Sequence, residues 1–134
     1  MITFTNVIYD KVITTLEVLL KAEFPSFKIN YDEHSAGQSF LLLPSADNLE
    51  ELGAIGQVRS YTVNVSYRTK AENKKVYRVL SEVAERVRRL VDNNVVYSSG
   101  STWFEAKIDS ITYEEEEGYF YANMIFICNV MDAR

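Results

Sequence analysis

Few residues of this sequence have the types and the spacing that chemistry requires. The single histidine, His34, directly follows Asp32 and Glu33, and three adjacent side chains cannot all point at one metal ion from a strand or a turn. A solvated polar turn is the simpler interpretation of this cluster. The sequence also contains neither the HExxH motif nor the paired cysteines of zinc sites. We therefore expect no metal site.

The possible nucleophiles and nucleotide-binding segments are equally isolated. No serine lies in a GxSxG motif, and no glycine-rich GxGxxG or GxxxxGK[ST] segment is present. Cys128 falls on the apolar face of an expected strand, where a cysteine acts as a small buried hydrophobe. Trp103 fits a core or an interface better than a platform for a base or a sugar. These observations predict a protein that is not an enzyme and that has no cofactor.

The composition predicts one globular domain over residues 1–134. Hydrophobic residues make up 47% and charged residues 25% of the chain, as in ordinary soluble proteins. A net charge of −5 disfavours a dedicated nucleic-acid binder. One cysteine allows no internal disulfide, and neither a signal peptide nor about 18 consecutive apolar residues are found. We expect a soluble protein made in the cytoplasm, without a membrane partner.

The expected fold is organised around residues Gln57–Asn93. Apolar and polar side chains alternate over Tyr61–Tyr67, which predicts a half-buried strand. Thr69–Glu72 matches a capping box, and the following helix has one apolar stripe and one charged stripe. The apolar stripe contains Val76, Val79, Leu80, Val83, Val87, Leu90 and Val91, and the charged one Lys75, Arg78, Glu82, Arg86 and Arg89.

The N-terminal part predicts a helix and two short strands. Helical spacing of apolar residues covers Thr5–Glu23, with Thr5 or Asn6 as the cap, and Phe24-Pro25 ends the helix. Phe27–Tyr31 alternates and is expected to form a strand. Phe40–Leu43 is wholly apolar, which favours a strand buried on both faces. Ser45–Gly56 is expected to be a loop, with one helical turn over Asp47–Leu52.

The C-terminal part predicts a long hairpin after an Asn93–Thr102 linker. Trp103–Tyr113 changes its alternation midway, which indicates a β-bulge near Asp109-Ser110. Glu114–Gly118 is the expected turn, and Tyr119–Val130 the last strand, apolar at every even position. The expected fold class is α+β, with about five mainly antiparallel strands, two helices on the sheet and the order α-β-β-β-α-β-β.

Two patches of opposite charge are candidate subunit contacts. The acidic patch is Glu114, Glu115, Glu116 and Glu117, and the basic patch is Lys75, Arg78, Arg86 and Arg89. The simpler interpretation is solvated surface, with Glu82–Arg86 and Glu85–Arg89 pairs along the helix. The sharper one is that the patches meet between subunits, beside Tyr119 and Tyr121 on the last strand.

The order of elements resembles that of the tail completion proteins of long-tailed bacteriophages, also called tail terminator or head–tail joining proteins. Three segments carry the resemblance: the strand Val58–Tyr67 ending in Tyr67-Arg68-Thr69, the helix Val76–Leu90 with Val87-Arg88-Arg89-Leu90, and the hairpin Ile108–Tyr113 with Tyr119–Phe126. The Asn93–Thr102 linker and the Ser45–Gly56 loop have no counterpart in that pattern.

The resemblance implies a structural virion protein without catalytic residues. Such proteins form a homo-oligomeric ring, typically hexameric, on the end of the tail tube in the neck of the virion. Its expected partners are the tail tube protein and the head-closure or connector protein. DNA would be passing cargo, and tail assembly would take place in the host cytoplasm. The alternatives are another small virion ring subunit (a head-closure or tail tube protein), a non-viral α+β binding module, or a small enzyme.

Overall fold

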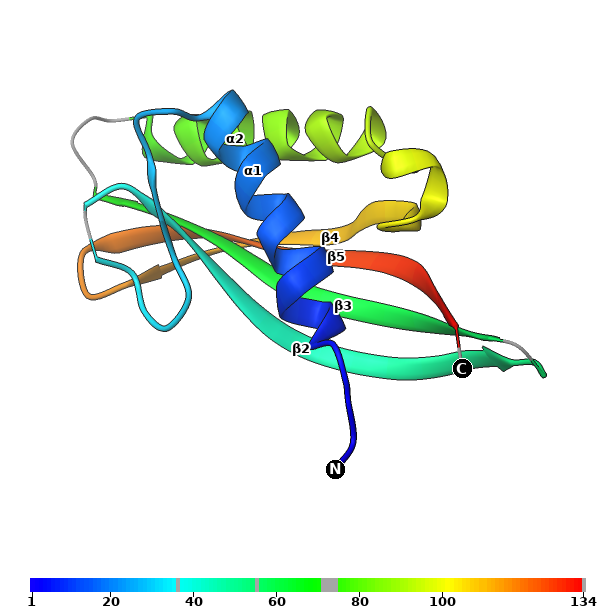
Figure 1. Ribbon diagram of the computed structural model, residues 1–134. Helices are drawn as coiled ribbons and strands as arrows, with labels where there is room; N and C mark the ends of the chain where they lie inside the picture. Colours follow the sequence, from blue (N-terminus) through cyan, green and yellow to red (C-terminus); the bar gives the residue numbers. More distant parts are fainter. Residues whose placement is uncertain (36, 55, 71–74, 134) are drawn as a thin grey trace.

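The computed structural model describes residues 1–35, 37–54, 56–70 and 75–133, which form a five-stranded sheet with α1 and α2 on one of its faces (Figure 1). A π-helical segment, Ile8–Ile13, runs directly into α1, Thr14–Glu23. The strands and the second helix are β1 (Lys28–Asn30), β2 (Ser39–Leu52), β3 (Gly56–Lys70), α2 (Val76–Asp92), β4 (Phe104–Glu116) and β5 (Tyr119–Ala133). A 3₁₀ turn, Ser98–Gly100, precedes β4. The α+β class and the order α-β-β-β-α-β-β are confirmed.

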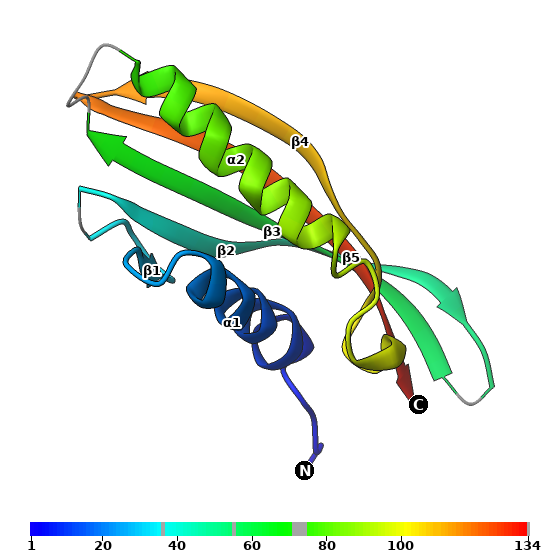
Figure 2. The ribbon, with the colours of Figure 1, turned by 90° about the horizontal axis from the view of Figure 1, so that it is seen from above.

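The sheet has the order β1-β2-β3-β5-β4. Only β1 pairs with its neighbour in parallel, and the other neighbours are antiparallel. β3 and β5 pair along their whole lengths, from Gly56↔Ala133 to Lys70↔Tyr119. α2 lies over β3, β5 and β4, and α1 lies beside it on the β2 side (Figure 2). The opposite face of the sheet therefore has no helical cover.

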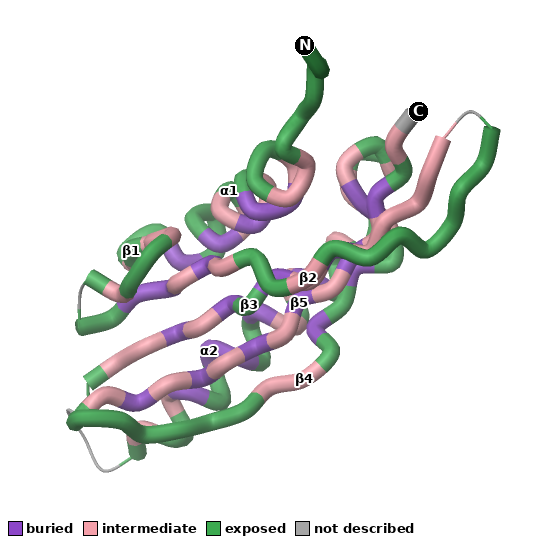
Figure 3. The backbone as a smooth tube through the Cα atoms, turned by 90° about the horizontal axis from the view of Figure 1, so that it is seen from below, coloured by how far each residue is buried: buried purple, intermediate pink, exposed green. Residues whose placement is uncertain are grey.

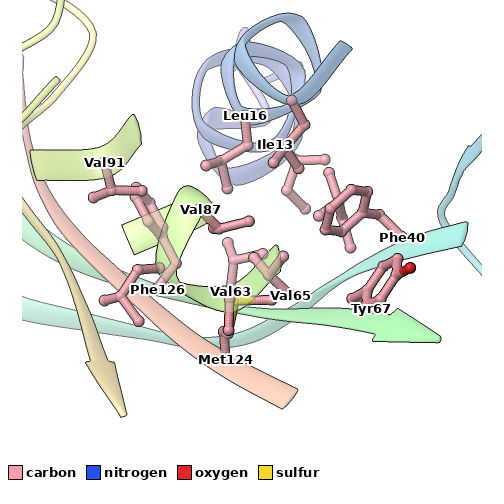
Figure 4. Close-up of a cluster of buried hydrophobic side chains, with 14 of the residues drawn as sticks. Ile13, Leu16, Phe40, Val63, Val65, Tyr67, Val87, Val91, Met124 and Phe126 are labelled. Carbon is pink, nitrogen blue, oxygen red and sulfur yellow. The ribbon is translucent and has the colours of Figure 1, made fainter. Parts of the chain in front are cut away.

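The core lies between the helices and the covered face of the sheet. In β3 the alternating residues Tyr61–Tyr67 are buried at every odd position, as the period of two predicts. α2 contributes Leu80, Val83, Ala84, Val87 and Val91. Figure 4 shows Val87 and Val91 of α2 and Ile13 and Leu16 of the first helix above Val63, Met124 and Phe126 of the sheet.

The expected Ser45–Gly56 loop is wrong, because β2 continues to Leu52 and pairs with β3. The register shifts between Pro44 and Ala46 and again between Leu49 and Glu51. Since β1 pairs only with the start of β2, Pro44 lies on a free edge, where a missing N–H and a bulge are tolerated. The helical turn over Asp47–Leu52 is wrong for the same reason.

The start of α2 also differs from the expectation. Thr69 lies in β3 opposite Phe120 and is not the residue that precedes the helix. α2 begins at Val76 after Lys75, which makes no side-chain capping bond. Two members of the expected capping box, Ala71 and Glu72, lie outside the described residues. At the other helix Asn6 does act as expected, because its side chain accepts a hydrogen bond from the Tyr9 amide at 3.4 Å.

The closing hairpin contains the expected bulge, and its turn is shorter than expected. The β4–β5 register shifts between Ile108 and Ser110, as the change of alternation predicted, and also between Phe104 and Lys107. β4 runs on to Glu116, so only Glu117 and Gly118 form the turn. Their φ values of 52° and 81° are those of a two-residue hairpin turn with both central residues left-handed.

Candidate assembly surface

The face of the sheet opposite the helices is open (Figure 3). We call the central residues of this surface the open sheet face: Leu41, Leu43, Thr62, Asn64, Ser66, Asn123, Ile125 and Ile127. Because side chains alternate along a strand, these residues point away from the core on β2, β3 and β5. All are half-buried except Asn64, which is exposed. The surface is thus flat, partly apolar and free of helical cover.

An open hollow of about 400 Å³ indents this face. Its lining combines the apolar Leu41, Leu43 and Ile125 with Asn64 and the ring of Tyr121. An open hollow with apolar walls and a few amide groups can receive a protruding side chain of another protein.

His34 borders the hollow and is more than a residue of a solvated turn. Its Nδ1 lies 2.6 Å from the Ser39 hydroxyl oxygen, and its Nε2 lies 3.2 Å from that of Ser66. Burial, with a smaller contribution from the charge of Arg68, lowers the pKa of His34 to about 4. The neutral imidazole therefore binds its loop to the sheet. The expected solvated turn is wrong for His34, whereas Asp32 and Glu33 are exposed as expected.

The His34–serine contacts do not make a reactive site. Ser39 is fully buried, so no substrate reaches its hydroxyl, whereas Ser66 is half-buried and borders the hollow. A histidine with a pKa of about 4 is a poor general base at neutral pH. Within the described ranges no three histidine, cysteine or acidic side chains lie close enough together to hold a metal ion.

The pKa of His34 has a consequence for stability. Because the folded pKa is lower than the ordinary 6.5, the unfolded chain binds the extra proton first as the pH falls. The free energy of unfolding should therefore drop by about 1–2 kcal/mol between pH 6.5 and 4, a figure that allows for solvent screening of a half-exposed group. Chemical denaturation at several pH values would measure this drop.

His34→Asn is the control for that measurement. Carboxylates titrate in both proteins, so the difference between wild type and variant isolates the histidine. Parallel stability curves from pH 7 to pH 4 would contradict the assignment.

Cys128 and Trp103 belong to the core. Burial raises the pKa of the Cys128 thiol to about 12, so the residue is an unreactive thiol at neutral pH. Trp103 is fully buried, and its indole N–H donates to the Asn94 carbonyl oxygen at 2.8 Å. Both sequence-based expectations are confirmed.

The acidic residues of the hairpin do not point in one direction. Glu114 and Glu116 lie opposite Tyr121 and Tyr119 on the side of the open sheet face, whereas Glu115 lies opposite Phe120 on the helix side. Glu114 accepts a hydrogen bond from the Asn123 amide at 2.8 Å. Glu114 and Glu116 are therefore part of the rim of the open sheet face, and Glu117 is in the turn.

Three arginines of the basic patch already have partners within the chain. Arg78 pairs with Glu82, Arg89 pairs with Glu85, and Arg86 pairs with Glu23 of α1, each at 3.0 Å. The expected Glu85–Arg89 pair is confirmed, and the Glu82–Arg86 pair is wrong because each of the two residues has another partner. Contact between these arginines and the acidic hairpin of another copy stays a prediction.

Two of the expected contact residues, Tyr119 and Tyr121, are half-buried beside the open sheet face. Their contact with another copy stays a prediction. Arg68 lies over the Tyr119 ring, 4.0 Å from its centroid. Leu41 and Leu43 were missed because the apolar run Phe40–Leu43 hides which residues face outward. In the structure they are half-buried, so the expectation of burial on both faces was wrong.

The fold and the open face define a small α+β domain with one uncovered sheet surface. No known protein-family model matches the chain, and no curated protein matches its sequence. Among solved structures, the chain is similar to one in a structure described as the virion of a native gene transfer agent (GTA) particle. That match has a TM-score of 0.68 and 10% identity over 96% of this chain and all of the other.

A second similar structure, of a protein without a functional description, has a TM-score of 0.58. It is 14% identical over 96% of this chain and 94% of the other. At these identities the two matches show a shared fold. None of the helices in the described ranges is both long and apolar enough to cross a membrane.

Proposed function

We propose that this protein is a structural component of a phage-like virion and that it forms a ring at the end of the tail tube, where it joins tail to head. The observation that carries the proposal is the match over the full length of a chain from a gene transfer agent virion. The order of elements in the sequence, which resembles that of tail completion proteins, supports the same function independently.

Features of the surface support an assembling role without catalysis. The open sheet face offers a flat, partly apolar contact area, and the low pKa of His34 makes it a poor general base for the neighbouring serines. The net charge of −5 suits a conduit that lets DNA pass without holding it. The proposed partners are other copies of the chain, the tail tube protein and the head-closure or connector protein.

The proposal is tested by assembly. Light scattering after size-exclusion chromatography should give a ring mass, typically a hexamer, and negative-stain microscopy should show rings with a central channel. Added to polymerising tail tube protein, the ring should bind tube ends and shorten the tubes. A protein that stays monomeric at high concentration, with or without tubes, would contradict the function. Rings that bind the head connector and ignore tubes would instead indicate a head-closure subunit.

A further inference from the structure

The open sheet face has the charge distribution of a protein interface. The central residues defined above carry no charge, and around them lie the carboxylates Glu51, Glu105, Glu114 and Glu116 and the cations Arg68 and Lys107. Interface centres are depleted of charged residues, which concentrate at the rim. Lys107 at the same rim is already paired with Asp109 at 3.6 Å.

The size of this surface is sufficient for a stable contact. β2, β3, β4 and β5 contain 14, 15, 13 and 15 residues. With strands spaced about 4.8 Å apart and about 3.3 Å per residue, they present about 900 Å² on one side. A standard protein–protein interface uses about the same area of each partner.

A second surface with complementary properties lies on the helical layer. Tyr77 and Arg88 are eleven positions apart in α2, about three turns, so they share one stripe of the helix, which we call the α2 flank. Tyr77 is 51% exposed although its ring packs edge-on against Phe120 at 5.5 Å. Arg88 is half-buried and forms no ion pair with the described residues. Tyrosine and arginine are the side chains that most often dominate binding energy.

We propose that the open sheet face of one copy binds the α2 flank of the next copy. This inference rests on the proposed ring function and names the contact between subunits from which the ring would be built. The two surfaces belong to opposite layers of the molecule (Figure 1), and a head-to-tail contact between two different surfaces generates a ring when its rotation closes. Arg88 then meets the carboxylate rim, while Tyr77 enters the hollow beside Ile125.

Charge disfavours other contacts between copies, such as edge-to-edge pairing and face-to-face packing of two sheets. The free edges of β2 and β4 carry Asp47, Glu50, Glu105 and Asp109, and carboxylates on strand edges oppose edge-to-edge pairing. On the rim of the open sheet face the four carboxylates outnumber the cations Arg68 and Lys107, so two such faces packed on each other would repel. The α2 flank instead brings Arg88, a cation without an ion-pair partner among the described residues.

The experiment breaks each surface separately and then mixes the products. Asn64→Lys places a charge at the centre of the open sheet face, and because Asn64 is exposed the fold should tolerate it. Arg88→Glu reverses the charge of the α2 flank, with Tyr77→Ala as a second variant of that surface. Val96→Lys is the matched control, because Val96 is 55% exposed and lies outside both surfaces.

Each single variant should lose at least about tenfold in assembly affinity by light scattering and should keep the wild-type melting curve. A 1:1 mixture of Asn64→Lys and Arg88→Glu should form dimers, because each dimer can use the one intact face and the one intact flank. The control should assemble like the wild type.

Four results would overturn the inference. Wild-type rings with normal assembly of Asn64→Lys, or a mixture that stays monomeric, would show that the subunit contact lies elsewhere. The ring function would then stand. If Asn64→Lys forms rings that no longer bind tubes, the face holds another virion protein instead of a second copy. A wild type that forms no ring at all contradicts both the proposed function and the contact between the open sheet face and the α2 flank.

Discussion

Replacing Val83 by aspartate is expected to unfold the protein. Val83 is 6% exposed and lies on the buried stripe of α2, among the core residues between this helix and the sheet. The described residues that form this core with Val83 are hydrophobic, so a carboxylate there is an uncompensated buried charge, which costs about 3–5 kcal/mol. Domains of this size are stable by about 5–15 kcal/mol, and the lost packing of the Val83 methyl groups adds to the cost of the charge, so most of the margin is lost. Far-UV circular dichroism during heating would measure the loss.

The control for this substitution is Ser81→Asp, two residues earlier on the exposed side of the same helix. It adds the same charge without burying it, so its melting curve should stay close to that of the wild type. A Val83→Asp protein that melts like Ser81→Asp would show that the apolar stripe of α2 does not face the core.

The elements that the sequence predicts well are those whose periodicity is imposed by burial on one side. α2 has a buried and a charged stripe because one side packs on the sheet, and β5 alternates because its even positions lie in the core. The second half of β2 shows no such pattern. The hairpin that it forms with β3 extends beyond the helices (Figure 2), so neither face selects apolar residues. Backbone pairing and the Arg59–Asp47 ion pair at 3.6 Å hold this segment extended.

Local motifs fail where pairing across the sheet outweighs them. Thr69 and its successors match a capping box, but Thr69 pairs with Phe120 in the β3–β5 ladder, and that ladder continues to Lys70. Pairing in the ladder gives the backbone groups of a strand residue hydrogen-bond partners on the neighbouring strand. A Thr69 helix cap would provide a partner for only one amide of the following turn.

The surface contacts depend on distant residues, which explains why only part of them could be predicted. His34 meets Ser66, which is 32 positions away in the sequence, and no local pattern indicates this contact. Arg86 pairs with Glu23, 63 positions away, because α1 lies beside α2. Spacing of four residues predicts pairs within one helix and cannot reveal a partner on another.

Trp103 connects the segment after α2 to the core, and Trp103→Ala should be the most destabilising change outside the helices. Its fully buried ring contacts Phe126 and Tyr97, with centroids 5.1 and 5.6 Å away. Its backbone carbonyl accepts the Tyr97 amide at 3.0 Å, and its indole N–H donates to Asn94. Truncation leaves a large cavity, so the free energy of unfolding should fall by about 3–5 kcal/mol.

Trp103→Phe separates the two contributions of this side chain. The phenyl ring still fills much of the site, but the Asn94 carbonyl loses its donor, so a loss of about 1–2 kcal/mol is expected. Urea unfolding of wild type, Trp103→Phe and Trp103→Ala should give that order of stability, with amide exchange in residues 93–102 accelerating in the same order. Equal stability of wild type and Trp103→Ala would contradict a structural role for the indole. Faster exchange in 93–102 without global destabilisation would show that Trp103 holds only this segment, while β3, β5 and α2 maintain the core on their own.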